Sequence, residues 1–259
     1  MSFDIFLCCA EKDYNKVKYV VEAIKNNVVG YNKIFLSTPT KLGVDIDGVE
    51  QYLDRDVLNI NPMNFKYRPN WIYQQFLKLF QTITPNDYYA TIDMDILINR
   101  KLPYFTGDGK PIWYQGWNQN NPPYFVYQEK MFDFAKVHDH TFIADMNFFN
   151  KGIINEMLDR YGYTLESFIS KSIDIISDTC YPAENELYGS YAHKYHYGMY
   201  EYIPLKFDVR GKEQDNPTDL VYTDEEIQRI IEESKNKDFD IIAMHSWCWK
   251  TSNSWGVLV

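Results

Sequence analysis

The first third of the chain alternates short apolar runs with one amphipathic stretch. Residues 3–10 form a short, mainly apolar run that is typical of a strand buried on both faces. Residues 14–26 carry apolar side chains at helical spacing, and residues 33–38 and 56–60 are expected to form two more strands. This strand–helix–strand opening predicts a parallel sheet with helical crossovers.

The rest of the chain also alternates segments with helix and strand patterns. Residues 71–83 form the clearest amphipathic helix, with an apolar stripe and with Gln74, Gln75 and Lys78 on other faces. An apolar strand is expected at 88–92. Further strands are expected at 111–115, 141–149 and 239–244, and helices at 153–161, 165–177, from about 182, and after a capping box at 223–226. The segments 116–123 and 210–219 are interpreted as loops. We therefore expect an α/β fold in a single domain.

Composition and charge narrow the functional class. The chain has 259 residues, 45% of them hydrophobic and 24% charged, which is typical of a globular protein. The formal charge of −10, without a basic run, argues against binding to a nucleic-acid backbone. Clustered carboxylates could instead collect a divalent cation.

The cysteines and the N-terminal residues indicate the cellular location of the protein. Cys8, Cys9, Cys180 and Cys248 include no CxxC pair, so a zinc site or a disulfide framework is a poor interpretation. The N-terminus lacks the basic region and apolar core of a signal peptide, and no apolar run reaches the roughly 18 residues of a membrane span. We expect a cytoplasmic protein without a membrane span.

Asp93 and Asp95 carry the most specific chemistry. They follow the apolar strand at 88–92, and ligands of open α/β sheets bind beyond the carboxyl ends of the strands. Residues two apart on a strand face the same way, so both carboxylates could converge on one site, where Mg²⁺ or Mn²⁺ would relieve their repulsion. The alternative is a solvated strand end followed by a turn.

The wider sequence context adds a resemblance. The chain resembles glycosyltransferases of the GT-A fold, and in particular a poorly characterised bacterial and large-virus group within them. The matching segments occur in the expected order over nearly the whole chain, at 3–10, 71–79 (WIYQQFLKL), 91–95 (TIDMD), 142–149 (FIADMNFF), 183–189 (AENELYG) and 244–247 (MHSW). The resemblance implies a Rossmann-like, mainly parallel mixed sheet flanked by helices. It also implies a single domain over 1–259, with a nucleotide-binding half at 1–100 and an acceptor-binding half at 101–259 that ends in a metal-ligand strand.

The resemblance assigns a metal site. Asp95 would bind Mn²⁺ or Mg²⁺ directly, Asp93 would contact the metal or the ribose of a nucleotide-sugar, and His245 would be a third ligand. The metal would stabilise charge on the departing nucleoside diphosphate as a Lewis acid. For His245, the alternative is a histidine that is buried beside Trp247 or simply exposed.

The resemblance also suggests nucleotide contacts. The base would bind near the end of the first strand. The diphosphate would meet cationic side chains, and Trp71, Gln75 and Lys78 share one side of their helix at a spacing that favours a common surface. The candidate contacts are Ala10, Glu11, Lys12, Asp13, Arg68, Gln75, Lys78 and Asp93. The charged residues among them could equally be ordinary solvated surface.

Three carboxylates are candidates for a general base that activates the acceptor: Glu184, Glu186 and Asp145. A helix that begins near 182 places both glutamates in its first turn, where the helix dipole favours the ionised form. Ordinary stabilisation of the helix would explain them as well. Trp117 could stack on an acceptor sugar or pack within its loop.

The expected activity is transfer of a sugar from a nucleoside diphosphate-sugar, with uridine as the favoured nucleoside, to a carbohydrate or another hydroxyl acceptor. Two alternatives stay open. A metal-dependent phosphoester or pyrophosphate hydrolase also needs clustered carboxylates. A non-catalytic carbohydrate-binding protein on the same fold would suit the 17% aromatic content.

Overall fold

The computed structural model describes residues 2–116, 120–210 and 221–245, and its centre is a mixed sheet. In this part of the chain the sheet has five strands in the order β4-β3-β1-β5-β9. The first four strands are parallel to one another, and β9 is antiparallel to β5. The strands are β1 (Phe3–Cys8), β3 (Tyr31–Thr38), β4 (Val49–Leu53), β5 (Tyr88–Ile92) and β9 (Met146–Asn150).

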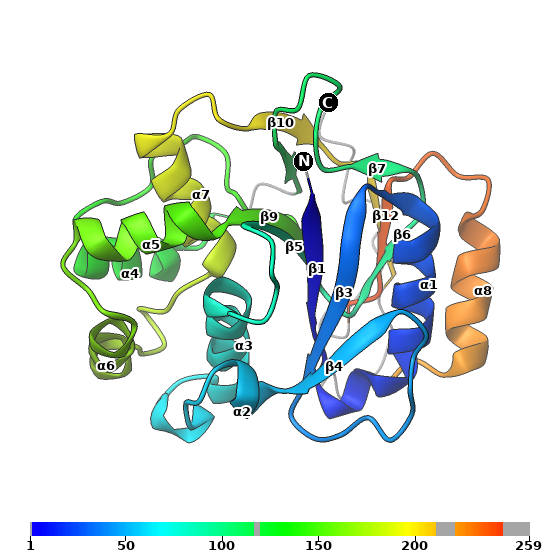
Figure 1. The fold of residues 1–259 in the computed structure, drawn as a ribbon, viewed down its shortest axis with the longest axis horizontal. Coiled ribbons are helices and arrows are strands. Elements are labelled where there is room, and N and C mark those ends of the chain that lie inside the picture. Colours follow the sequence, from blue (N-terminus) through cyan, green and yellow to red (C-terminus); the bar gives the residue numbers. More distant parts are fainter. Residues whose placement is uncertain (1, 117–119, 211–220, 246–259) are drawn as a thin grey trace.

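Helices flank this sheet, which makes the chain an α/β protein. In the view of Figure 1, α1 and α8 lie to the right of β1, and helices α3 to α7 lie to the left. The long helices are α1 (Val17–Asn27), α3 (Pro69–Phe80), α4 (Pro122–Phe132), α5 (Lys151–Arg160), α6 (Leu165–Ile175), α7 (Glu184–Tyr195) and α8 (Asp224–Ser234). Short helical turns form α2 (Asp54–Val57), η1 (Glu11–Lys16) and η2 (Pro62–Asn64). No helix in the described ranges is long and apolar enough to cross a bilayer.

A smaller sheet brings the last described residues close to the main sheet. It consists of β11 (Phe207–Val209), β12 (Ile241–Ala243) and β6 (Ile96–Ile98), with β12 antiparallel to β6. Just beyond that pairing, Met244 N–H donates to the Asp95 carbonyl at 2.7 Å. Residue 245 is therefore placed next to the turn that follows β5. Two-stranded pairs join β10 (Glu201–Pro204) to β8 (Ile112–Gln115) and β2 (Val28–Val29) to β7 (Leu102–Pro103).

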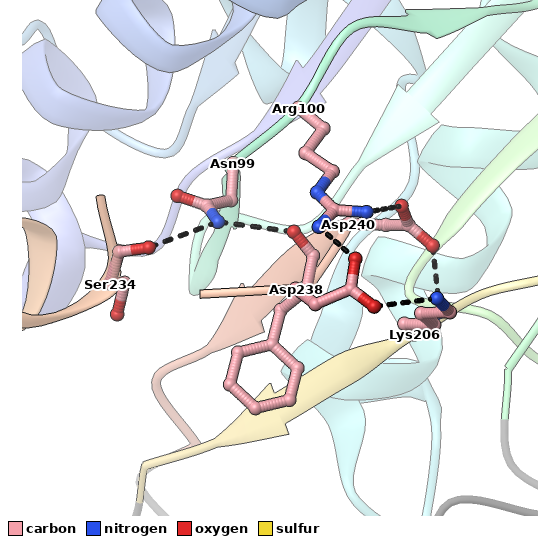
Figure 2. A network of polar contacts seen from close by, with 7 residues as sticks. Asn99, Arg100, Lys206, Ser234, Asp238 and Asp240 are labelled. Carbon is pink, nitrogen blue, oxygen red and sulfur yellow. Dashed lines mark hydrogen bonds and ion pairs between the residues drawn. The ribbon is translucent and has the colours of Figure 1, made fainter. Parts of the chain in front are cut away.

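A polar network fixes the entry to β12 (Figure 2). Arg100, which follows β6, forms ion pairs with Asp238 and Asp240. Lys206 Nζ lies 2.7 Å from Asp238, and Lys206 N–H donates to Asp240 at 2.8 Å. The Asn99 amide donates to two backbone carbonyls of the connection between α8 and β12, those of Ser234 at 3.3 Å and Phe239 at 3.0 Å. Because the network holds both ends of this connection, the register of β12 against β6 is constrained.

Most predicted elements are confirmed, with ends shifted by a few residues. The strand at 88–92 is β5 and the helix at 71–83 is α3. The capping box is present as predicted, since the Thr223 side chain accepts from Glu226 N–H and the Glu226 carboxylate accepts from Thr223 N–H. Cys8, Cys9 and Cys180 are buried free thiols.

Three predictions about the elements are wrong. The strand expected at 56–60 is absent, and the third strand is β4 at Val49–Leu53, which is half-buried and therefore carries no apolar run. The strand expected at 141–149 begins only at Met146, because Asp145 adopts a left-handed backbone conformation with φ of 46°. The loop expected at 116–123 ends early, because α4 begins at Pro122 with proline in its first turn.

Candidate functional site

Asp93 and Asp95 lie in a turn at the carboxyl end of β5. The strand ends at Ile92, and the turn is closed by Ile96 N–H, which donates to the Asp93 carbonyl at 3.0 Å. Asp93 N–H donates to the Asp145 carbonyl at 2.9 Å, so the start of β9 is tied to the same turn. Because the two aspartates are in a turn and not in a strand, they do not follow the same-face rule, and each carboxylate meets its own partner.

Asp95 pairs with His245. His245 Nδ1 lies 3.0 Å from Asp95 Oδ2, and Nε2 of the same ring lies 3.5 Å from Asp145 Oδ2. Burial opposes the charged forms of both groups, but the interaction between them outweighs it. The two aspartates raise the pKa of His245 well above its usual value, and His245 holds the pKa of Asp95 below its usual value.

Asp93 pairs with a buried lysine from α3. Lys78 Nζ forms an ion pair with Asp93 Oδ1 and lies 3.0 Å from Glu184 Oε1, which comes from α7. Burial alone would lower the pKa of Lys78, but the two carboxylates raise it above its usual value. Burial raises the pKa of Asp93 to about 7. The charge of Lys78 opposes this shift, and the charges of Asp145, Asp95 and Glu184 add to it.

The face of α3 that carries Gln75 and Lys78 is buried, although both residues lie off the apolar stripe of the helix. Both residues are only 4% exposed, and the Lys78 charge is already compensated by two carboxylates. Trp71, one turn earlier, is partly buried among Tyr124 and Tyr181. A direct contact from Gln75 or Lys78 to a nucleotide stays a prediction.

Glu184 and Glu186 do lie in the first turn of α7, as predicted. Glu186 Oε2 accepts the Phe142 N–H at 2.9 Å, and Oε1 accepts the Ser190 hydroxyl at 3.3 Å. Despite these hydrogen bonds, burial raises the pKa of Glu186 to about 7. The start of a helix favours an ionised carboxylate, but for Glu186 the loss of water around the fully buried group outweighs this effect.

Two residues of this region have a left-handed backbone. In the described ranges, three residues other than glycine have a left-handed backbone: Arg68 with φ of 42°, Asp145 with φ of 46°, and Asp133 with φ of 52°. Asp145 contacts His245, and Arg68 lines the cavity beside the cluster. A left-handed conformation costs an ordinary residue energy and persists only where the surrounding structure enforces it, and such residues collect at functional sites.

A cavity of about 840 Å³ opens at the carboxyl end of β1. Four of the predicted nucleotide contacts line it, namely Ala10, Glu11, Lys12 and Arg68, and the Arg68 guanidinium lies 4.2 Å from the ring centre of Trp71, another lining residue. Asp13 is not among the lining residues and pairs with Lys16 at 2.7 Å. The volume falls within the range of small-molecule sites, which is roughly 300–1,000 Å³.

The cavity adjoins the carboxylate cluster. Cys8, at the end of β1, lines the cavity. Burial raises the pKa of this thiol, and the charges of Asp54, Asp93 and Glu184 raise it further, while Lys78 lowers it. β1 ends at this cavity and pairs with β5, whose end carries Asp93 and Asp95, so the cavity and the cluster lie at the ends of neighbouring strands.

Two residues of this region escaped the sequence analysis. Lys16 is 1% exposed, lies 5.3 Å from the ring centre of Tyr222, and lowers the pKa of Asp95 through its charge. Asp54 lines the cavity after β4. Neither residue belongs to a sequence motif. They become neighbours of the site only through the packing of segments that are distant in the sequence. Trp117 and Trp247 lie outside the described residues.

The donor types at the cluster suit a hard divalent cation, because carboxylate oxygens are the preferred ligands of Mg²⁺ and Mn²⁺ and imidazole is acceptable to Mn²⁺. Among the residues that the structure describes, however, no three histidine, cysteine, aspartate or glutamate side chains stand close enough together to hold an ion as they are. Asp95 and His245 form the closest pair for the proposed metal. The full ligand set stays a prediction.

Comparison of the sequence with protein-family models found no matching family, and comparison with curated proteins found no match.

Proposed function

We propose that this chain is a metal-dependent glycosyltransferase of the GT-A fold, which uses a nucleoside diphosphate-sugar as donor. One observation carries the proposal: an aspartate–histidine pair and two further carboxylates lie at the strand ends, next to a cavity lined by four of the eight residues predicted to bind the nucleotide. The strand order, with parallel strands and one antiparallel strand beyond β5, also agrees with the proposed fold.

The metal would be held at the aspartate–histidine pair. Asp95 and His245 would be ligands, and Asp93 would complete the set. Bound there, a divalent cation would neutralise the charge that develops on the departing diphosphate. Lys78 would support the site indirectly, because its ammonium holds one oxygen of Asp93 and leaves the other oxygen available to the metal.

The nucleotide would occupy the cavity beside β1. Arg68 and Lys12 provide positive charge along its walls, which otherwise include the carboxylates of Glu11 and Asp54. The left-handed backbone of Arg68 and the contact of its guanidinium with the Trp71 ring fix the direction of that cation. A cation fixed in this way loses less conformational entropy when it binds a diphosphate.

During transfer, the bond between the sugar and the diphosphate oxygen breaks, a new bond forms to the acceptor oxygen, and the acceptor hydroxyl loses its proton. The base that receives this proton must reach the acceptor. The Asp145 side chain is 20% exposed, whereas Glu184 is 2% exposed and Glu186 is fully buried. Accessibility therefore favours Asp145 among the three candidates, and makes Glu184 and Glu186 better suited to holding α7 in place.

A donor screen tests the proposal. Purified protein is incubated with UDP-, GDP- and CDP-sugars, with and without Mn²⁺, and release of the nucleoside diphosphate is measured. We expect release with one donor class, dependent on Mn²⁺, and lost in Asp95→Asn. The matched control is Asp47→Asn, a carboxylate that is fully exposed and pairs only with Lys25 at the surface.

Two outcomes would contradict the proposal. One is the absence of any Mn²⁺-dependent nucleotide release or binding across the donor panel. The other is release of free sugar at the same rate with and without every acceptor offered, which would favour the hydrolase.

A further inference from the structure

Residues 141–144 are buried although they form no helix or strand. They lead directly into Asp145, which has a left-handed backbone and is the carboxylate that accessibility favours as the base. Buried backbone without regular structure must find hydrogen-bond partners elsewhere, and a left-handed residue persists only where its surroundings enforce it. The contacts of residues 141–144 therefore help to set where the Asp145 carboxylate lies.

Two buried side chains hold the peptide groups of Phe142. The Glu186 carboxylate, from the first turn of α7, accepts the Phe142 N–H through Oε2 at 2.9 Å. The Trp113 indole, from β8, donates through Nε1 to the Phe142 carbonyl at 3.2 Å. Both side chains lie in the core, so loss of either one leaves a polar group of Phe142 buried without that partner, and the backbone would have to shift to satisfy it.

Two glycines allow the segment to lie close to the elements that hold it. A Cβ on Gly189, in α7, would lie 2.2 Å from Cγ of Phe142. A Cβ on Gly116, which follows β8, would lie 2.8 Å from the Ile143 carbonyl oxygen. The segment is therefore packed directly against α7 and the end of β8, in a place that its hydrogen bonds to the same two elements define.

The proposed metal pair is held by other elements. Pairing of β12 with β6 brings His245 to Asp95, and Met244 N–H donates to the Asp95 carbonyl. These contacts do not pass through residues 141–144. A disturbance of the segment is therefore expected to move Asp145 more than it moves Asp95 and His245.

We propose, resting on the proposed function, that Glu186 is a positioning residue, which directs the Asp145 carboxylate toward the acceptor by holding the Phe142 N–H. This role requires the reach of the Glu186 side chain and not its charge. Glutamine has the same length and its amide oxygen can accept the N–H, whereas aspartate keeps the carboxylate but is shorter by one carbon–carbon bond, about 1.5 Å. A general base has the opposite requirement, because it must accept a proton.

Glu186→Gln and Glu186→Asp separate these roles. Release of the nucleoside diphosphate is followed with Mn²⁺ and the most active of the UDP-, GDP- and CDP-sugars, with water and methyl glycosides as acceptors. We expect Glu186→Gln to keep the kcat of the unmodified protein and Glu186→Asp to lower kcat at least about tenfold, because a misplacement of about 1 Å can cost about a hundredfold. The Kd of the nucleoside diphosphate with Mn²⁺ should stay close to that of the unmodified protein in both variants.

Glu156→Asp is the matched control. It makes the same change in α5, where the Glu156 carboxylate accepts from the Tyr191 hydroxyl of α7 at 2.7 Å, a hydrogen bond that does not pass through residues 141–144. This variant should keep kcat. Trp113→Phe removes the donor to the Phe142 carbonyl and probes the same segment independently, so it should lower kcat and leave nucleotide binding in place. Urea unfolding shows that each variant is folded under the assay conditions.

Three outcomes would contradict the proposal in different ways. Loss of kcat in Glu186→Gln, with Glu186→Asp still active, would make Glu186 the base and overturn the positioning role. Full kcat in folded Glu186→Asp or Trp113→Phe would mean that the segment does not place Asp145. Both results leave the proposed function standing, whereas absence of Mn²⁺-dependent nucleotide release and binding in the unmodified protein overturns the proposed function itself.

Discussion

His245 Nδ1 lies 3.0 Å from Asp95 Oδ2, although the two residues are 150 positions apart in the sequence. Pairing of β12 with β6 and the hydrogen bond from Met244 N–H to the Asp95 carbonyl hold the two side chains together. The contact joins the turn after β5 to the last described strand. It is the part of the molecule on which the proposed metal site depends.

Removal of either partner should weaken metal binding. In the unmodified protein we expect Mn²⁺ and UDP together to raise the melting temperature more than either does alone, because ligands that bind only the folded state stabilise it. Asp95→Asn and His245→Gln should each weaken Mn²⁺ binding at least about tenfold, which is the lower end of losses seen even for residues that only support a ligand. Thermal melting with added Mn²⁺ or EDTA measures this. A joint shift of full size in both variants would exclude this pair as the metal site.

Loss of the Lys78 charge should destabilise the fold. Lys78→Met leaves the Asp93 and Glu184 carboxylates without their shared cation, and breaking one side of a buried ion pair costs about 3–5 kcal/mol. Adding Glu184→Gln to that variant should recover part of the loss. Urea unfolding gives the free energies. Lys33→Met is the control, because its pair with Glu50 is open to solvent and should contribute little to stability. Equal losses for the two lysines would contradict the buried pairing.

Glu186 should make stability depend on pH. The ordinary pKa of glutamate is 4.5 and the folded protein raises that of Glu186 to about 7, so the native state binds more protons between these values. Stability contributed by this group is therefore present below about pH 4.5, declines as pH rises to about 7, and is constant above that. The total change is of the order of 3 kcal/mol.

Glu186→Gln tests that linkage. The glutamine can still accept the Phe142 N–H but cannot ionise. The free energy of unfolding of the variant minus that of the unmodified protein should therefore be larger at pH 8 than at pH 5. Denaturant unfolding at the two pH values provides the comparison. A difference between the proteins that is the same at both pH values would mean that Glu186 titrates normally.

The contact between α7 and Phe142 should tolerate no added methyl group. A Cβ on Gly189 would lie 2.2 Å from Cγ of Phe142, at the base of that side chain, where a rotamer change gives little relief. We expect Gly189→Ala to cost more than about 2 kcal/mol, as overpacked cores do. Gly107→Ala, which meets no atom within 4 Å, should be close to neutral. Chemical denaturation of the two variants distinguishes them, and equal stabilities would contradict the close packing.

The sequence alone determined the elements whose signals are local. The apolar runs at β1, β3 and β5, the helical spacing of α3 and the capping box of α8 each depend on neighbouring residues, and each was predicted near its observed position. The sequence also indicated Asp93 and Asp95 as unusual, because paired carboxylates that end an apolar strand need a partner.

Only the tertiary structure decided which partners these groups have. Whether Lys78 is a surface cation or a buried counter-ion depends on α7, which supplies Glu184 from 106 positions away. Helical spacing predicted the apolar stripe of α3 but could not tell that the side with Gln75 and Lys78 is buried as well, because an aliphatic stem and a charged end are compatible with either environment. The edge strand β4 and Asp54 after it carry no apolar pattern, and they become part of the site through pairing with β3. Local propensity identifies elements, but partners separated by a hundred residues are set by packing.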